Sequence, residues 1–142
     1  MRKLLIALAA AVVVVPAFAA DTSDPGSYVC LSEHAIGFRL GRDGKWAPSQ
    51  FSAQGKKYLL EKKGARWLWT EVGPPDARPE SCDAFTDGFA ECKYSEGDVL
   101  FNRKTLRFQL VRRYGYVTSD VATDKESNNA PPYMMIGKCS AQ

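Results

Sequence analysis

The chain has 142 residues, 45% of them hydrophobic and 25% charged, and this balance is typical of a single globular domain with at most a short tail. It excludes a disordered chain, a collagen and a coiled coil. The formal net charge is +3, and removing Arg2 and Lys3, which precede an apolar run, leaves 17 of the 19 basic residues against 16 acidic ones. Nucleic-acid and membrane-surface binding require an excess of Lys and Arg, so this near balance disfavours both, and no nucleic-acid partner is expected.

The first 19 residues have the features of a secretory signal peptide. A positively charged head precedes an uninterrupted apolar stretch over residues 4–15, and Ala17 and Ala19 occupy the small-residue positions that a signal peptidase reads. The alternative, a membrane anchor, needs about 20 apolar residues, and Pro16 ends this run sooner. We therefore expect cleavage after Ala19 and a periplasmic or secreted protein, with no transmembrane segment in the mature chain.

Four cysteines follow this segment and would meet an oxidising compartment, where two disulfides are the default. They are Cys30, Cys82, Cys92 and Cys139. Three pairings are possible, and we prefer Cys82 with Cys92, which closes a short ring, and Cys30 with Cys139, which ties the first strand to the last. Zinc is the alternative, but there is no C-x-x-C and His34 is the sole histidine. Neither a metal nor a cofactor is expected.

The mature chain begins with a polar lead-in over residues 20–27, and a single β domain is expected from residue 28 to residue 142. Residues 35–40 alternate, which is the period of a half-buried strand, with three apolar residues on one face: Ile36, Phe38 and Leu40. A turn is expected at residues 41–44.

The middle of the chain contains a predicted hairpin between two irregular segments. Residues 46–51 are too broken for a helix. Residues 57–62 and 66–72 are strand candidates, and their short connection predicts an antiparallel hairpin. Three prolines make residues 73–80 a loop, and residues 81–89 have room for one helical turn.

The clearest element is a β-hairpin near the end of the chain. Val99 and Phe101 alternate with Asp98 and Leu100, and residues 102–105 offer a turn. After the turn, the alternation continues with three apolar residues on one face: Leu106, Phe108 and Leu110.

A polar stretch over residues 115–132 then predicts a long surface loop, with a short strand around residues 116–121, and residues 133–139 form a last apolar strand. Six to eight short strands separated by turns indicate an all-β fold, a small antiparallel β-barrel or sandwich.

Little in the sequence suits catalysis. His34 stands beside Glu33 without a G-x-S-x-G element, and the cysteines are assigned to disulfides, so a solvated loop histidine is the simpler interpretation. The carboxylates include no pair whose separation follows from the sequence, so a small carboxylate-dependent hydrolase stays an open alternative. No catalytic residue is assigned.

Trp67 and Trp69 are candidate binding residues. They are two apart, so in a strand they share one face and Leu68 lies on the other. With the Leu68 face in the core, two indoles would stand in solvent, where they could stack on a sugar or anchor a protein. The alternative is that both fill the barrel interior, because an indole buries a large apolar area.

A basic cluster around the last hairpin is the second candidate. Its five members suggest an anionic partner, such as an acidic protein, lipopolysaccharide or peptidoglycan carboxylates; they are Arg103, Lys104, Arg107, Arg112 and Arg113. The alternative is a charged outer sheet face that prevents association between sheet edges.

Several segments together resemble small exported proteins of unknown function from Gram-negative bacteria, especially alphaproteobacteria. These segments are the signal peptide, Tyr28-Val29-Cys30, Gly44-Lys45-Trp46, FNRKTLRF at residues 101–108 and IGKCS at residues 136–140. In size, export and cysteine use the chain is also similar to the periplasmic lysozyme inhibitors, which are small disulfide-tied β-barrels. The resemblance brings no activity and no inhibitory residues with it.

These observations favour a monomeric, non-enzymatic binding module of the cell envelope, whose partner is an envelope component or a protein. The alternatives are an inhibitor of a cell-wall hydrolase such as lysozyme, and a small hydrolase that uses carboxylates.

Overall fold

The computed structural model describes residues 25–95, 97–113, 115–118 and 131–142; the predicted signal peptide lies outside this part of the chain. The described elements are nine strands and one helical turn. They are β1 (Ser27–Leu40), β2 (Trp46–Phe51), β3 (Lys57–Lys63), β4 (Arg66–Val72), β5 (Glu80–Cys82), β6 (Phe89–Tyr94), β7 (Gly97–Asn102), β8 (Arg107–Arg112), α1 (Gly115–Thr118) and β9 (Tyr133–Ala141).

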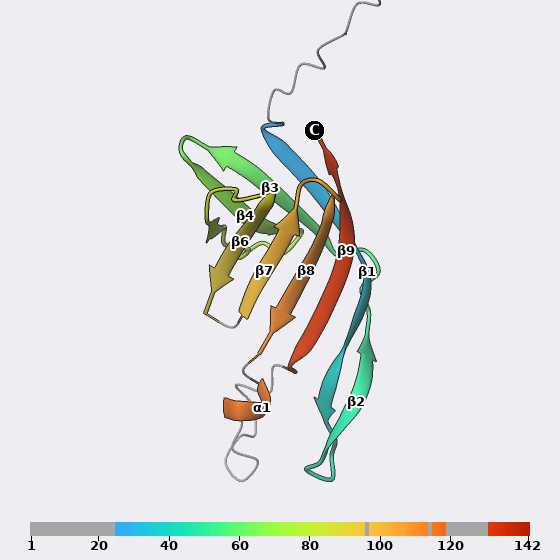
Figure 1. Cartoon of the computed structure of the whole chain (residues 1–142). Coiled ribbons are helices and arrows are strands. Elements are labelled where there is room, and N and C mark those ends of the chain that lie inside the picture. Colours follow the sequence, from blue (N-terminus) through green and yellow to red (C-terminus); the bar gives the residue numbers. More distant parts are fainter. Residues whose placement is uncertain (1–24, 96, 114, 119–130) are drawn as a thin grey trace, which may run out of the picture.

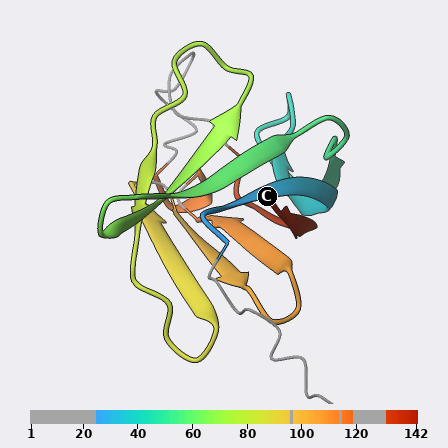
Figure 2. The ribbon, with the colours of Figure 1, turned by 90° about the horizontal axis from the view of Figure 1, so that it is seen from above.

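The strands close into an eight-stranded antiparallel barrel (Figures 1 and 2). Each strand from β3 to β9 pairs with the next, and β1 pairs with β3 on one side and with β9 on the other. Closure leaves no open edge in the barrel itself. The predicted all-β barrel is confirmed, with β2 as one strand in addition to the ring.

β1 is long because its two halves pair with different strands. Residues 27–31 pair with β3 inside the barrel, whereas residues 35–40 pair with β2. Residues 34–37 still pair with β9, and residues 38–40 extend beyond this pairing. Residues 35–40 form with β2 a two-stranded ribbon, which we call the β1–β2 ribbon and whose far end projects below the barrel in Figure 1. A β-bulge between Ser32 and His34 marks the change, and the Ser32 hydroxyl donates to the Lys56 carbonyl at 3.1 Å.

The bulge reverses which side chains of β1 face inward. Before it, Tyr28 and Cys30 face the core; after it, Ala35 does. The strand predicted over residues 35–40 is confirmed, but its apolar face is turned outward, with Ile36 59% and Phe38 50% exposed. A shift of one residue moves a whole set of side chains to the opposite face.

The core consists of the inward positions of the strands. Val99, Phe101, Phe108 and Leu110 are buried, which confirms the hairpin predicted from their alternation. Leu106 lies in the turn and packs against this core from its edge.

Both preferred disulfides are present. The sulfur atoms are 1.99 Å apart in Cys30–Cys139 and 2.07 Å apart in Cys82–Cys92, and each bond joins two residues that are direct register partners. The first bond ties β1 to β9, and the second ties β5 to β6.

Two predicted elements are wrong. Residues 81–89 contain β5 and a tight Thr86–Phe89 bridge in place of a helical turn; Asp87 and Gly88 both have positive φ there, which suits a turn between antiparallel partners. Gly115–Thr118 is the helical turn α1, so no strand begins at residue 116, and the rest of the predicted strand lies outside the described residues.

Candidate functional site

Trp67 and Trp69 lie inside the barrel. They are 4% and 3% exposed, so neither indole stands in solvent. The interpretation as solvent-exposed binding residues is wrong, and both side chains fill the barrel interior. Trp67 packs edge-on against Phe85 with ring centres 5.0 Å apart, and Trp69 stacks on Tyr58 at 4.9 Å. Their face is the inward one because Trp67 is the register partner of Cys82, which is itself buried.

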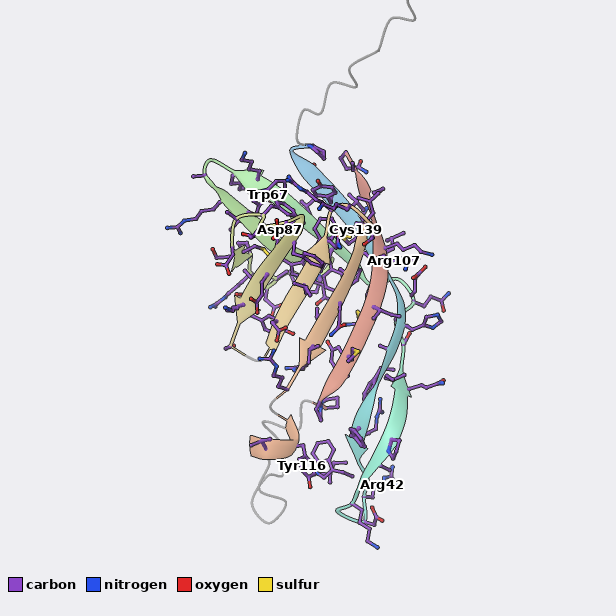
Figure 3. All side chains as sticks on the ribbon, viewed as in Figure 1. Arg42, Trp67, Asp87, Arg107, Tyr116 and Cys139 are labelled. Carbon is purple, nitrogen blue, oxygen red and sulfur yellow. A yellow bond between two sulfur atoms is a disulfide. The ribbon has the colours of Figure 1, made fainter. Side chains whose placement is uncertain are left out.

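The five predicted basic residues do not form one patch. Arg103 and Lys104 lie in the turn between β7 and β8, whereas Arg112 and Arg113 lie at the opposite end of β8, about 17 Å away along the strand. The Arg103 guanidinium covers the Phe85 ring at 4.8 Å, and Arg113 pairs with Asp98. Arg107 is exposed at the start of β8 (Figure 3).

The outer wall carries a continuous row of apolar side chains across four neighbouring strands. Val111 of β8 is the register partner of Met134 of β9, and Met134 is the partner of Ile36 of β1. Phe38 follows Ile36 on the same face and pairs with Pro48 of β2. We call these five residues the apolar lane.

The apolar lane lines a groove of about 630 Å³ at the root of the β1–β2 ribbon. Besides Ile36 and Phe38, Met134 is 43% exposed, and Ile136 of β9 and Leu100 of β7, each 42% exposed, extend the apolar surface along the barrel wall. The polar side chains of the groove lie at its margins, with Ser49 and Gln50 on β2 and Arg112 on β8.

The two ends of the apolar lane differ in charge. At the β8 end, Arg112 lines the groove and Arg113 follows it, with 57% of the Arg113 side chain exposed beside Asp98. Past the β2 end, Trp46 contacts Tyr116 of α1 edge-on with ring centres 5.7 Å apart, and Figure 3 shows Tyr116 between α1 and the β1–β2 ribbon.

A second hollow of about 320 Å³ lies at the end of the barrel near the β4–β5 connection. We call it the barrel mouth. Its walls are aromatic and its rim is charged; the walls include Tyr58, Trp69, Tyr94 and Tyr133, and the rim includes Glu71, Asp76, Arg78, Glu80 and Arg112.

Tyr58 forms part of the aromatic wall of the barrel mouth and is buried. Its hydroxyl donates to the sulfur of Met135 at 3.4 Å. Burial, with a smaller contribution from the Glu71 carboxylate, raises the pKa of Tyr58 well above its usual value, because both disfavour a phenolate. The phenol therefore stays neutral and does not supply a general base.

No family model, curated protein or solved structure matches this chain. The resemblance to small exported proteins and to the lysozyme inhibitors therefore stays a prediction from the sequence segments that carry it.

Two further observations concern only the described residues. No group of three or more His, Cys, Asp or Glu side chains among them is arranged to hold a metal ion. None of their helices has the length and apolar composition needed to cross a membrane.

The apolar lane escapes prediction because its residues have the same pattern as a core strand. Ile36 and Phe38 alternate with Gly37 and Arg39 just as buried residues would, and the bulge that turns them outward leaves no local sign. The sequence of β9 does indicate an exposed apolar face. Met134 and Ile136 alternate with Met135 and Gly137, so neither face of the strand carries a charge over these four residues.

Proposed function

We propose that this protein is an exported, non-enzymatic binding module of the cell envelope and that its binding surface is the apolar lane. The observation that carries the proposal is the exposure of Ile36, Phe38 and Met134 on one continuous face. Soluble monomers rarely expose contiguous apolar patches larger than about 300 to 600 Å², and patches of that size often serve an interaction.

Export is part of the proposal and is supported by the sequence of residues 1–19 together with the two disulfides. Disulfides persist in the periplasm and outside the cell, whereas the cytosol keeps thiols reduced. Mass spectrometry of protein recovered from the periplasm should show a chain starting at Ala20 or Asp21. Recovery of a full-length, membrane-embedded chain as the main species would refute export.

Basic side chains beside the apolar lane favour a partner with negative charge. Arg112 and Arg113 lie at the β8 end, and farther along the wall Arg107 is the register partner of Lys138. Lys138 pairs with Glu33 at 2.8 Å and lowers the pKa of that carboxyl, so Glu33 partly neutralises this second pair of cations. Asp98 likewise offsets part of the charge at the β8 end, but Arg112 lines the groove whereas Arg107 and Lys138 do not.

The proposal is tested by binding envelope extract to immobilised protein. The expected result is saturable retention that Met134→Glu abolishes, because a carboxylate in the apolar lane opposes burial of any apolar partner. Val72→Glu is the matched control, since Val72 is also a half-exposed apolar strand residue but lies at the end of β4, outside the lane. Equal retention by both variants would place the binding elsewhere.

An inhibitor of a cell-wall hydrolase is a narrower version of the same proposal, in which the partner is the hydrolase. Lysozyme activity would then fall in the presence of the protein and recover when Met134→Glu replaces it. Inhibition that persists with Met134→Glu would separate the inhibitory surface from the apolar lane.

A carboxylate-dependent hydrolase is a second candidate, and the charged rim of the barrel mouth is the observation that favours it. Glu71, Asp76 and Glu80 line one hollow, as an acid and base pair requires. Glu71 also forms an ion pair with Lys56 at 3.4 Å. Turnover of a cell-wall glycan that Glu71→Gln or Glu80→Gln abolishes would support this candidate, and the absence of turnover would reject it.

A further inference from the structure

We propose that the apolar lane binds the alkyl chain of a free fatty-acid anion, with the carboxylate at the end formed by Arg112 and Arg113. This inference rests on the proposed function, because it names the chemical class of the partner that the lane receives.

The groove has the dimensions of a small-ligand site. It crosses β8, β9, β1 and β2, and three inter-strand steps amount to about 14 Å, which an extended dodecyl chain spans. Its volume of about 630 Å³ lies within the range of small-molecule pockets. A stable protein interface uses about 20 to 30 residues on each side, many more than the apolar lane provides.

The chemistry of the walls selects a ligand body without polar groups. The middle of the apolar lane consists of Met134, Ile36 and Phe38, whose side chains carry no strong hydrogen-bonding group. A sugar or an extended peptide lying there would leave hydroxyl, N–H or C=O groups without partners, and each such group costs free energy when buried. An alkyl chain has none to satisfy.

Charge then orients the chain. The polar groups of the β2 end, Ser49 and Gln50, are neutral, whereas the β8 end keeps a net positive charge. Arg112 lies there between the groove and the barrel mouth, and Arg113 beside it pairs with Asp98. Guanidinium groups bind carboxylates with charge-assisted hydrogen bonds. An alkyl chain with a negative head group therefore fits the groove in one direction.

The free edge of β2 does not offer a competing mode of binding through an added strand. The Phe38 N–H donates to the Pro132 carbonyl on the β9 side, so Phe38 and Pro48 form a pair without hydrogen bonds between them, and the nitrogen of Pro48 faces the open edge. Proline has no N–H to donate there. The middle of this edge is consequently blocked for strand addition.

The test is calorimetric titration of the purified, delipidated protein with dodecanoate below its critical micelle concentration. We expect one site per chain, and affinity that rises about fourfold for each methylene from octanoate to dodecanoate, as burial of each CH₂ predicts. Dodecyltrimethylammonium, with the same chain and the opposite charge, should bind at least about tenfold more weakly than dodecanoate.

Matched variants locate the site. Ile36→Ser should weaken dodecanoate binding at least about fivefold, whereas Leu31→Ser should leave it unchanged; both residues are exposed aliphatics of β1, at 59% and 55%, and only Ile36 lies in the lane. The double variant Arg112→Gln with Arg113→Gln should weaken binding about tenfold.

Lys62→Gln with Arg66→Gln removes the same charge at the β3–β4 turn and is the control for the arginine pair. Near-ultraviolet circular dichroism confirms that each variant is folded.

Failure of this inference is distinguishable from failure of the proposed function. No saturable dodecanoate binding, or equal binding of the two head groups, overturns the inference, as does an Ile36→Ser protein that binds normally. If the protein sediments with phosphatidylglycerol vesicles but does not bind monomeric dodecanoate, the partner of the apolar lane is a membrane surface and not a single fatty-acid anion. If Met134→Glu still abolishes retention of envelope components in that case, the proposed function stands without the fatty acid.

Discussion

Cys30 and Cys139 are register partners across the β1–β9 seam, and the disulfide between them closes the barrel at the point where its first and last strands meet. The Cys82–Cys92 bond joins neighbouring strands that are close in sequence. The two bonds therefore restrict the unfolded chain to very different extents.

Replacing Cys30 and Cys139 by Ala should cost about 5 kcal/mol of unfolding free energy, and replacing Cys82 and Cys92 about 3 kcal/mol, since loop-closure entropy grows with the loop that is tied. The sequence separations are 109 and 10 residues. Urea denaturation of the two double variants measures the difference. Equal losses would show that native contacts, and not chain restriction, account for the stabilisation.

Phe108→Ala should destabilise the protein by about 3 to 5 kcal/mol, because it leaves a cavity among Tyr58, Trp69 and neighbouring core residues. Arg107→Ala, one position earlier on the outer face, should cost little. Thermal unfolding of both variants gives the comparison. A larger loss for Arg107→Ala would contradict the inward assignment of this strand.

Gly37→Ala should destabilise the protein by about 1 to 3 kcal/mol. A Cβ at Gly37 would lie 2.1 Å from the carbonyl oxygen of Pro132, so β1 and the start of β9 would have to separate. Gly26→Ala is the control, since a Cβ at Gly26 meets nothing within 4 Å. If the two variants unfold at the same urea concentration, β1 and β9 do not approach each other this closely.

Stability should fall as the pH rises above about 10, where tyrosine ordinarily ionises. Burial raises the pKa of Tyr58 in the folded protein, so above that pH the unfolded chain releases a proton that the folded chain retains. The unfolding free energy then decreases with pH by up to about 1.4 kcal/mol per unit from this group. Tyr58→Phe should remove that part of the slope, and identical slopes in both proteins would contradict the assignment.

The sequence predicts the barrel through local patterns and misses what depends on register. Val99, Phe101 and Phe108 are bulky and alternate cleanly, so the β7–β8 hairpin is evident. β6 escapes notice because its inward residues, Ala90 and Cys92, are small while the aromatic Phe89 faces outward.

The apolar lane is harder still to foresee, because it combines residues of four strands that lie far apart in the sequence. Val111 and Met134 meet Ile36 only after β8, β9 and β1 have paired in a defined register. The bulge after Ser32 then decides which face of β1 is exposed. The basic residues form a group because they are close in sequence, but an extended strand places Arg103 and Arg112 at opposite ends of β8.

The seam between β1 and β9 also sets the order of events during synthesis. β1 emerges from the ribosome first among the strands and β9 last, so the hydrogen-bonding edges of β1 and β8 have no final partner until Tyr133–Ala141 becomes available. Vectorial folding strand by strand cannot complete this ring. A nascent or translocating chain must hold two open edges apart until its final segment arrives, and pairings that depend on such distant segments form slowly.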